Sequence, residues 1–152
     1  MKWIVIFALL LIAGFGGFFG FIKFNPPLIE GGLGATENKE AVVISLGNKG
    51  MGEIHFTGVQ VNSDESPSAA AFQVVDAATG FTISNDFENE GNSGAHFQSV
   101  AKTVMHPNTD PVPQNDEDII YGLSVRADER IHTVKVAYEY FGLRFLKEVT
   151  IE

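Results

Sequence analysis

The chain has 152 residues, a formal net charge of −9 from 10 basic and 19 acidic side chains, and no cysteine. At about 100 to 200 residues per domain, this length holds one compact domain. The absence of cysteine excludes a disulfide-stapled mini-domain and a cysteine-based zinc site. Removing residues 1–23 leaves 8 basic against 19 acidic side chains, a net charge of −11. Nucleic acid is therefore excluded as a partner, because a phosphate backbone requires a basic surface.

Residues 3–22 (WIVIFALLLIAGFGGFFGFI) contain no charged side chain. Twenty helical residues span about 30 Å, the thickness of the hydrocarbon core of a bilayer. Lys2 and Lys23 flank this run as interfacial residues do, and the Asn-Pro-Pro sequence at 25–27 ends the helix. We therefore predict that residues 1–23 form a single-pass transmembrane anchor that contacts the lipid bilayer through residues 3–22.

A cleaved secretory signal is the alternative interpretation of this segment. Its charged region would be a single lysine, its apolar region would be unusually long, and no small-residue cleavage site follows promptly. An uncleaved signal-anchor fits better. The amino terminus and Lys2 before the helix, against Lys23 after it, favour a cytoplasmic amino terminus in the cell membrane and an extracytoplasmic C-terminal domain.

Small residues follow one face of the predicted helix at Ala13, Gly16, Gly17 and Gly20. Such a face allows a second helix to approach closely, so it is a candidate helix–helix contact for a homo-oligomer or for a membrane partner. Glycine is also simply common in membrane helices, and that alternative stays open.

Residues 24–40 contain two prolines, three glycines and a polar run, without helical or strand periodicity. We predict an irregular Pro/Gly-rich linker over 24–40 and a folded domain over 41–152. From residue 41 onward apolar residues alternate with a period of two, which is typical of half-buried strands. Gly58 is placed for a bulge, and the inward parity of Lys147 predicts an edge strand.

Seven to eight short strands at a spacing of about 8 to 12 residues indicate an antiparallel β-sandwich, an all-β fold. The runs that predict them are 42–46, 54–61, 71–76, 79–85, 119–125, 134–140 and 145–151, and residues 95–105 fit either a strand or a short helical turn. The loop 106–118 contains three prolines. It is either a crossover connection between two sheets or a semi-rigid recognition loop.

The stretches VVISLGNKGMGEIHFTGVQVN (42–62) and IIYGLSVRADERIHTVKVAYEYFGLRFLKEVTI (119–151) resemble the first and last hairpins of an immunoglobulin-like bacterial surface domain. The whole arrangement is similar to small uncharacterised membrane-anchored proteins of Gram-positive bacteria. The resemblance implies an immunoglobulin-like β-sandwich behind one helix, and it implies no reaction. Immunoglobulin domains with a Cys…Trp…Cys core are excluded, because this part of the chain has neither residue.

Two acidic clusters are the candidates for a metal site, and calcium is the metal that they suit. Asp86, Glu88 and Glu90 imitate the first half of a calcium loop, but position 12 is Phe97 where a bidentate glutamate is required. Asp116 and Asp118 lie in the loop 106–118. Solvated loops account for both clusters, so we assign no metal and no cofactor.

Catalysis needs a nucleophile, a base and a stabilising group that converge, and the sequence offers no such set. The four histidines have no H-x-x-x-H or H-x-H spacing. We therefore expect a non-enzymatic, membrane-tethered domain that binds or braces another cell-envelope component. The alternative is an accessory subunit of a membrane protein complex, assembled through the small-residue face.

Overall fold

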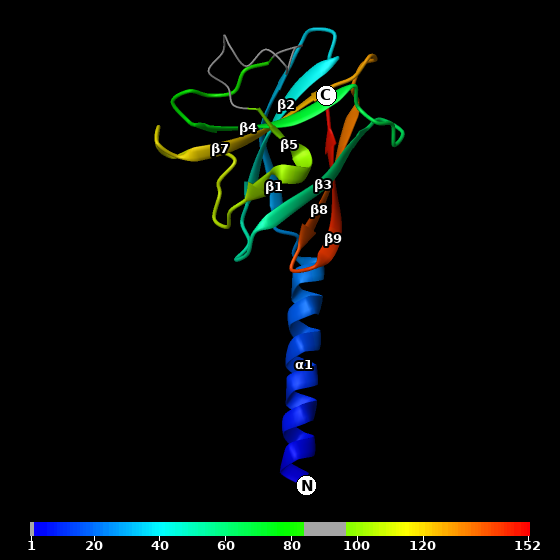
Figure 1. The fold of residues 1–152 in the computed structure, drawn as a ribbon, viewed down its shortest axis with the longest axis vertical. Coiled ribbons are helices and arrows are strands. Elements are labelled where there is room, and N and C mark those ends of the chain that lie inside the picture. The colour runs from blue at the N-terminus through cyan, green and yellow to red at the C-terminus, as the bar shows by residue number, and fades with distance from the viewer. Residues whose placement is uncertain (1, 84–96) are drawn as a thin grey trace.

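The computed structural model describes residues 2–83 and 97–152, with a long helix extending from one end of a β-sandwich (Figure 1). Helix α1 spans Lys2–Phe24. Among the described residues it is the one helix long and apolar enough to cross a membrane. The apolar run at 3–22 thus forms the helix that its length predicts.

Nine strands within the described residues form two antiparallel sheets of orders β1-β2-β7-β4-β5 and β6-β3-β8-β9. The strands are β1 Leu28–Ala35, β2 Ala41–Asn48, β3 Ile54–Val61, β4 Ala69–Asp76, β5 Phe97–Ser99, β6 Val104–Met105, β7 Ile119–Arg126, β8 Thr133–Tyr140 and β9 Leu143–Thr150. A 3₁₀ turn over Val100–Lys102 separates β5 from β6. With β5 and β6 set aside, these orders are the A-B-E-D and C-F-G sheets of an immunoglobulin-type sandwich. The predicted all-β sandwich behind one helix is confirmed, with nine strands where seven to eight were expected.

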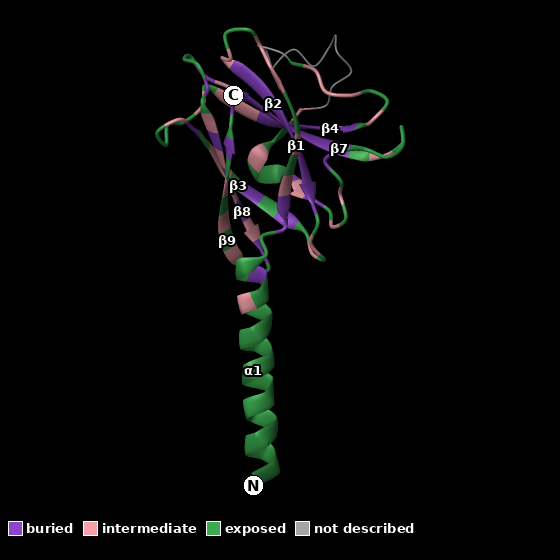
Figure 2. Cartoon of the chain, turned by 180° about the vertical axis from the view of Figure 1, so that it is seen from behind, coloured by how far each residue is buried: buried purple, intermediate pink, exposed green. Residues whose placement is uncertain are grey.

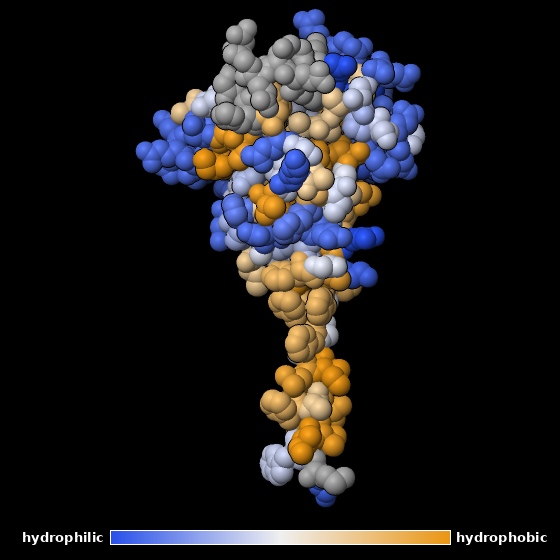
Figure 3. Space-filling model, in the orientation of Figure 1, coloured by the Kyte–Doolittle hydropathy of each residue, from blue (hydrophilic) through white to orange (hydrophobic). Residues whose placement is uncertain are grey.

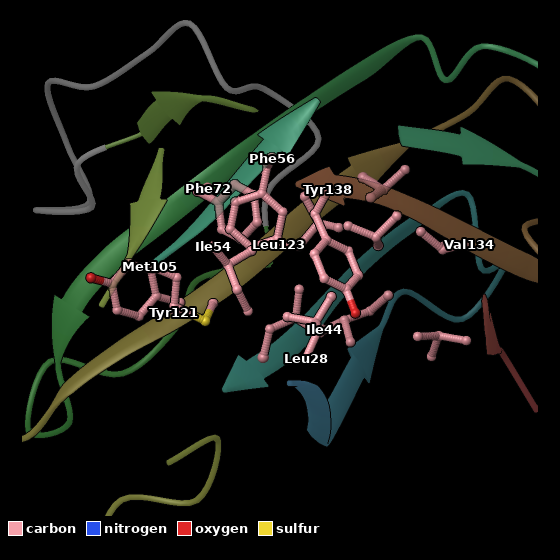
Figure 4. Close-up of a cluster of buried hydrophobic side chains, with 14 of the residues drawn as sticks. Leu28, Ile44, Ile54, Phe56, Phe72, Met105, Tyr121, Leu123, Val134 and Tyr138 are labelled. Atoms are coloured by element: carbon pink, nitrogen blue, oxygen red, sulfur yellow. The ribbon is translucent and has the colours of Figure 1, made fainter. Parts of the chain in front are cut away.

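The two sheets share one apolar core, to which side chains from strands of both sheets contribute (Figure 4). Phe56 of the second sheet packs on Phe72 of the first, with ring centroids 4.3 Å apart. Tyr138 stacks on Phe145 at 5.3 Å, and burial raises the pKa of the Tyr138 hydroxyl to about 12. Burial of these faces supplies the main driving force for folding.

Strand β2 is buried along its whole length, because both of its faces are covered. One face belongs to the core, and the loop 106–118 crosses the other. Ser45 Oγ donates a hydrogen bond of 2.6 Å to the carbonyl of Pro111, and Asn48 and Thr109 exchange backbone hydrogen bonds of 2.8 and 3.1 Å. The loop joins β6 of one sheet to β7 of the other, which confirms its interpretation as a crossover connection.

The predicted irregular linker at 24–40 was wrong for its middle part. Leu28–Ala35 forms β1, which pairs with β2 and has a register shift between Glu30 and Leu33. Its glycines hide the strand in the sequence, yet one of them is needed for packing. A Cβ on Gly31 would lie only 2.7 Å from Pro111 Cβ. The first sheet therefore begins at Leu28, with only three residues between it and the end of α1.

Two smaller predictions were also wrong. Residues 79–83 of the run predicted as a strand at 79–85 form no strand. The Gln73 side chain takes the place of a neighbouring strand there, accepting from the Thr82 N–H at 2.9 Å and donating to its carbonyl at 2.7 Å. In addition, β2 and β3 lie in different sheets, so residues 42–62 are not a hairpin, whereas β8 and β9 are one.

The sequence correctly indicates two local features of the second sheet. A register shift in β3 between Phe56 and Gly58 is the bulge expected at that glycine. Strand β9 is an edge strand, as the inward parity of Lys147 predicts. Lys147 Nζ lies 3.2 Å from Glu30 Oε2 on β1, so this ion pair joins the outer strands of the two sheets.

The close contact between β2 and the loop 106–118 generates a stability prediction. A Cβ on Gly47 would lie 2.4 Å from Pro111 Cδ and 2.6 Å from the Thr109 carbonyl oxygen, whereas a Cβ on Gly58 would meet nothing within 4 Å. Gly47→Ala should lower the free energy of unfolding by about 1–3 kcal/mol, the usual cost of overpacking. Gly58→Ala is the matched control and should change it by less than about 0.5 kcal/mol. Chemical unfolding of the detergent-solubilised full chain measures both, and equal effects would contradict this packing.

Candidate functional site

The junction between helix and sandwich is built from residues that belong to both. Ile22 of α1 is 2% exposed and joins the same apolar cluster as Leu28 of β1. Asn25 ends the helix by donating from Nδ2 to the carbonyl of Phe21 at 2.9 Å. Figure 2 shows α1 exposed along most of its length, with one buried residue near its C-terminal end. One side chain of the last turn of the helix, that of Ile22, is therefore part of the core of the domain.

Two loop tips of the sandwich surround this end of the helix. The β2–β3 tip contributes Met51, whose backbone N–H donates to the Tyr140 hydroxyl at 3.0 Å. The β8–β9 tip contributes Phe141, whose ring centroid lies 5.6 Å from that of Phe18. The Phe141 ring also covers Gly52, where a Cβ would approach it to 2.8 Å. We call the residues 23–27, 49–52 and 141–142 the base of the domain.

The base encloses an open pocket of about 430 Å³. Its walls come from four parts of the chain: the end of α1 with the residues that follow it, the β2–β3 tip, Asn108 of the crossover loop and Tyr140. The polar residues that line this pocket are Asn25, Lys49, Asn108 and Tyr140. No nucleophile, general base and stabilising group converge among the residues that line this pocket.

The β8–β9 turn has an unusual residue at its tip. Tyr140 pairs with Leu143, so Phe141 and Gly142 form a two-residue turn, and their φ angles are +49° and +73°. Such turns prefer Asn-Gly or Asp-Gly, because a left-handed backbone costs other residues about 1–2 kcal/mol. Among the described residues, the other non-glycine residues with positive φ are Lys39, Asn62, Asp64 and Asn108, all polar. An aromatic residue at this position implies a contact that offsets the cost.

The base is apolar and carries only positive charge. Phe24, Met51 and Phe141 are 84%, 66% and 45% exposed, and they come from three separate segments. Lys23 and Lys49 are exposed beside them, and none of the base residues is acidic. In Figure 3 the apolar surface of the helix continues onto the underside of the domain, where it meets a hydrophilic band.

The opposite end of the sandwich, which we call the far end, consists of the connections 36–40, 62–68 and 127–132. Hydrogen bonds tie these connections together: Ala127 N donates to the Glu40 carbonyl at 2.9 Å, and Ser68 Oγ donates to Asp128 Oδ1 at 2.8 Å. The three segments contain six acidic and two basic side chains, a net charge of −4. The domain thus has a cationic, apolar end beside the helix and an anionic end away from it.

The acidic calcium candidates divide into two groups. Asp86, Glu88 and Glu90 lie outside the described residues. Asp116 and Asp118 lie in the crossover loop, where Asp118 Oδ2 accepts backbone hydrogen bonds from Gln114 and Asn115 at 2.8 and 2.9 Å. These bonds lower the pKa of the Asp118 carboxyl below its ordinary value. Asp118 therefore acts as a turn cap.

The described residues contain no group of three or more side chains placed to hold a metal ion. The arrangement that most resembles a metal site is Glu53 with two histidines. Glu53 Oε1 lies 3.1 Å from His106 Nδ1, and Glu53 Oε2 lies 3.9 Å from His55 Nε2. All three side chains are about half exposed or more. Solvent weakens such ion pairs, so this cluster has the geometry of surface contacts.

The small-residue face of α1 has no partner within the described part of the chain. A Cβ placed on Gly16, Gly17 or Gly20 would meet nothing within 4 Å. At about 100° per residue, the face centred on Ala13 points roughly opposite to Ile22, which packs into the sandwich. The structure therefore leaves the predicted helix–helix contact open on the side away from the junction.

Comparison with protein-family models, curated proteins and solved structures found no match to this chain. The candidate site is therefore argued from the geometry of its residues alone. The base was not predicted from the sequence, because residues 24–40 were expected to form an irregular linker. One available signal was the Phe-Gly pair at 141–142, which puts an aromatic residue where a tight turn prefers Asn.

The cap at Asp118 generates a prediction of pH dependence. A carboxyl whose pKa is lowered by folding stabilises the fold above its unfolded pKa, and this contribution is lost as the pH falls through the lowered value. The ordinary value is 3.8. Asp118→Asn should therefore reduce the loss of thermal stability between about pH 5 and about pH 2. Glu117→Gln removes the neighbouring charge and should preserve the wild-type acid dependence. Melting temperatures in detergent measure this, and identical acid profiles for wild type and Asp118→Asn would contradict the cap.

Proposed function

We propose that this protein is a non-enzymatic, single-pass membrane protein of the cell envelope, similar to small anchored proteins of Gram-positive bacteria. Its β-sandwich lies outside the cytoplasm and binds or braces another envelope component. The observation that carries the proposal is the burial of Ile22 in the core of the sandwich. A domain built around the end of an apolar helix is held directly at the membrane surface.

The same observation supports an uncleaved anchor. Cleavage after the apolar run would remove Ile22, which is 2% exposed, and would open the core beside Leu28. A buried isoleucine contributes about 1.5–3 kcal/mol, a large part of the stability of a small domain. Retention of α1 therefore preserves the fold as well as the membrane attachment.

The charge distribution supports a protein partner with a cationic surface. The far end has a net charge of −4, which favours a cationic surface on a neighbouring protein and disfavours anionic polymers. Attachment to the membrane raises the effective concentration of this surface for partners in the same membrane. No cofactor is needed for such a role.

The alternative function is an accessory subunit of a membrane complex. The small-residue face at Ala13, Gly16, Gly17 and Gly20 supports it, because this face is open and points away from the sandwich junction. In that case the helix would carry the association, as a homo-oligomer or with another protein, and the sandwich would serve as a scaffold.

Proximity labelling tests the two functions together. Strand β9 runs toward the far end, so a peroxidase fused after Glu152 reaches neighbours of that surface. A membrane-impermeant biotin reagent should label neighbours in intact cells, since the domain is expected outside the cytoplasm. Glu37→Lys with Glu129→Lys should reduce labelling of the main neighbour at least about fivefold, the scale of a binding change near 1 kcal/mol.

The matched control carries the same charge change in the crossover loop, Asp116→Lys with Glu117→Lys, and should label as wild type does. Gly16→Leu with Gly20→Leu should also leave labelling unchanged if the far end binds the partner. Loss of labelling with the glycine variant alone would favour the accessory subunit. Labelling confined to cytoplasmic proteins with a permeant reagent would contradict the proposed orientation.

A further inference from the structure

We propose that the base of the sandwich is itself seated in the bilayer interface. Phe141 and Met51 lie at the boundary between lipid headgroups and acyl chains, and Lys49 lies beside lipid phosphates. The inference rests on the anchoring of α1 proposed above, and it adds a contact between lipid and the folded domain.

The depth of Phe141 follows from its contact with the helix. Its ring centroid is 5.6 Å from that of Phe18. Phe18 precedes Ile22, the end of the apolar run, by one helical turn, about 6 Å along the axis. If residues 3–22 span the hydrocarbon core, the β8–β9 tip lies at the level of the last apolar turn. A domain held clear of the membrane would have to draw Phe18 out with it.

The composition of the base matches that environment. Phe24, Met51 and Phe141 remain 84%, 66% and 45% exposed in the folded chain. Aromatic side chains and lysines are enriched at membrane interfaces, where the ring meets the acyl chains and the ammonium meets the phosphates. Lys23 and Lys49 are the charged residues of the base, and the acidic far end lies at the other end of the sandwich. Anionic lipid therefore attracts this end of the domain and repels the other.

The backbone of the tip supports the same conclusion. Phe141 occupies a left-handed position, at φ +49°, where Asn is the favoured residue of such a turn. Within the chain the ring contacts Phe18, Tyr140 and Gly52, and the residue nevertheless stays 45% exposed. Lipid contact explains why an aromatic side chain stands at this position despite the cost of its conformation.

Depth-dependent fluorescence quenching tests this inference on the full chain. Trp3 is the single tryptophan, so Trp3→Phe gives a silent background. Phe141→Trp in that background is reconstituted into phosphatidylcholine–phosphatidylglycerol vesicles that contain lipid spin-labelled near the headgroup. We expect at least twofold stronger quenching than for Leu146→Trp, an exposed position three residues along β9 from Leu143 and toward the far end.

A second variant separates lipid contact from folding. Phe141→Asn places the favoured residue in the turn, so the melting temperature of the domain in detergent should not fall by more than a few degrees. Quenching of a Met51→Trp reporter should nevertheless drop at least twofold in the Phe141→Asn variant, because the base loses its apolar contact.

The outcomes distinguish this inference from the anchoring on which it rests. If the chain fails to float with the vesicles, the anchor is wrong and the seated base is wrong with it. If the chain floats but Phe141→Trp and Leu146→Trp are quenched equally, the anchor stands and the seated base is overturned. Quenching that rises with protein density and not with spin-labelled lipid would indicate a second copy on the base, and would also overturn it.

Discussion

The burial of Ile22 is the constraint on which the rest of the structure depends. This side chain belongs at once to the apolar helix and to the core between the sheets, where Leu28 joins it. Only residues 25–27 separate the helix from the first strand, and two of the three are prolines. Helix and sandwich therefore form one continuous body, and every surface of the domain has a defined distance from the end of α1.

Because helix and sandwich form one body, the base, the far end and the small-residue face of α1 point in three different directions. The base surrounds the helix end, carries Lys23 and Lys49, and is otherwise apolar or uncharged. The far end lies across the sandwich and has a net charge of −4 from six acidic and two basic side chains. The small-residue face of α1 points away from the junction. Attraction to anionic lipid at one end and repulsion at the other would hold the same orientation that the packing around Ile22 imposes.

The sequence predicts most of the sandwich because its strands alternate apolar and polar residues. Burial alternates along the whole of β8, and the inward lysine of β9 correctly marks an edge. Strand β1 escapes prediction because it contains three glycines and no regular alternation, and only pairing with β2 makes it a strand. Residues 79–83 show the opposite error, because their pattern predicts a strand that does not form. The buried Gln73 side chain bonds to the backbone of Thr82, in place of the hydrogen bonds of a neighbouring strand. Local pattern cannot reveal either outcome, because both depend on distant residues.

The candidate site was less predictable than the fold. The small-residue face and the acidic loops are visible as patterns in the sequence. In the structure Asp118, one of the acidic loop residues, caps a turn. The base brings together three segments, of which the first and last lie more than 110 residues apart along the chain, as expected of contacts set by topology rather than by local sequence. Its defining contact, Phe18 against Phe141, joins a residue within the apolar run to a residue in a turn. Apolar periodicity assigns each of them a different role and gives no reason to connect them.

A distance measurement between helix and sandwich tests the central claim most directly. The chain has no cysteine, so Ile12→Cys and Thr57→Cys, both at exposed positions, introduce two unique spin-label sites. Electron–electron double resonance on the full chain in lipid nanodiscs then reports the distribution of distances between them. We predict one narrow distribution, broadened when Ile22→Gly removes the shared core contact. A broad distribution in the otherwise native chain, unchanged by Ile22→Gly, would show a flexible tether and contradict the claim that helix and domain are one body.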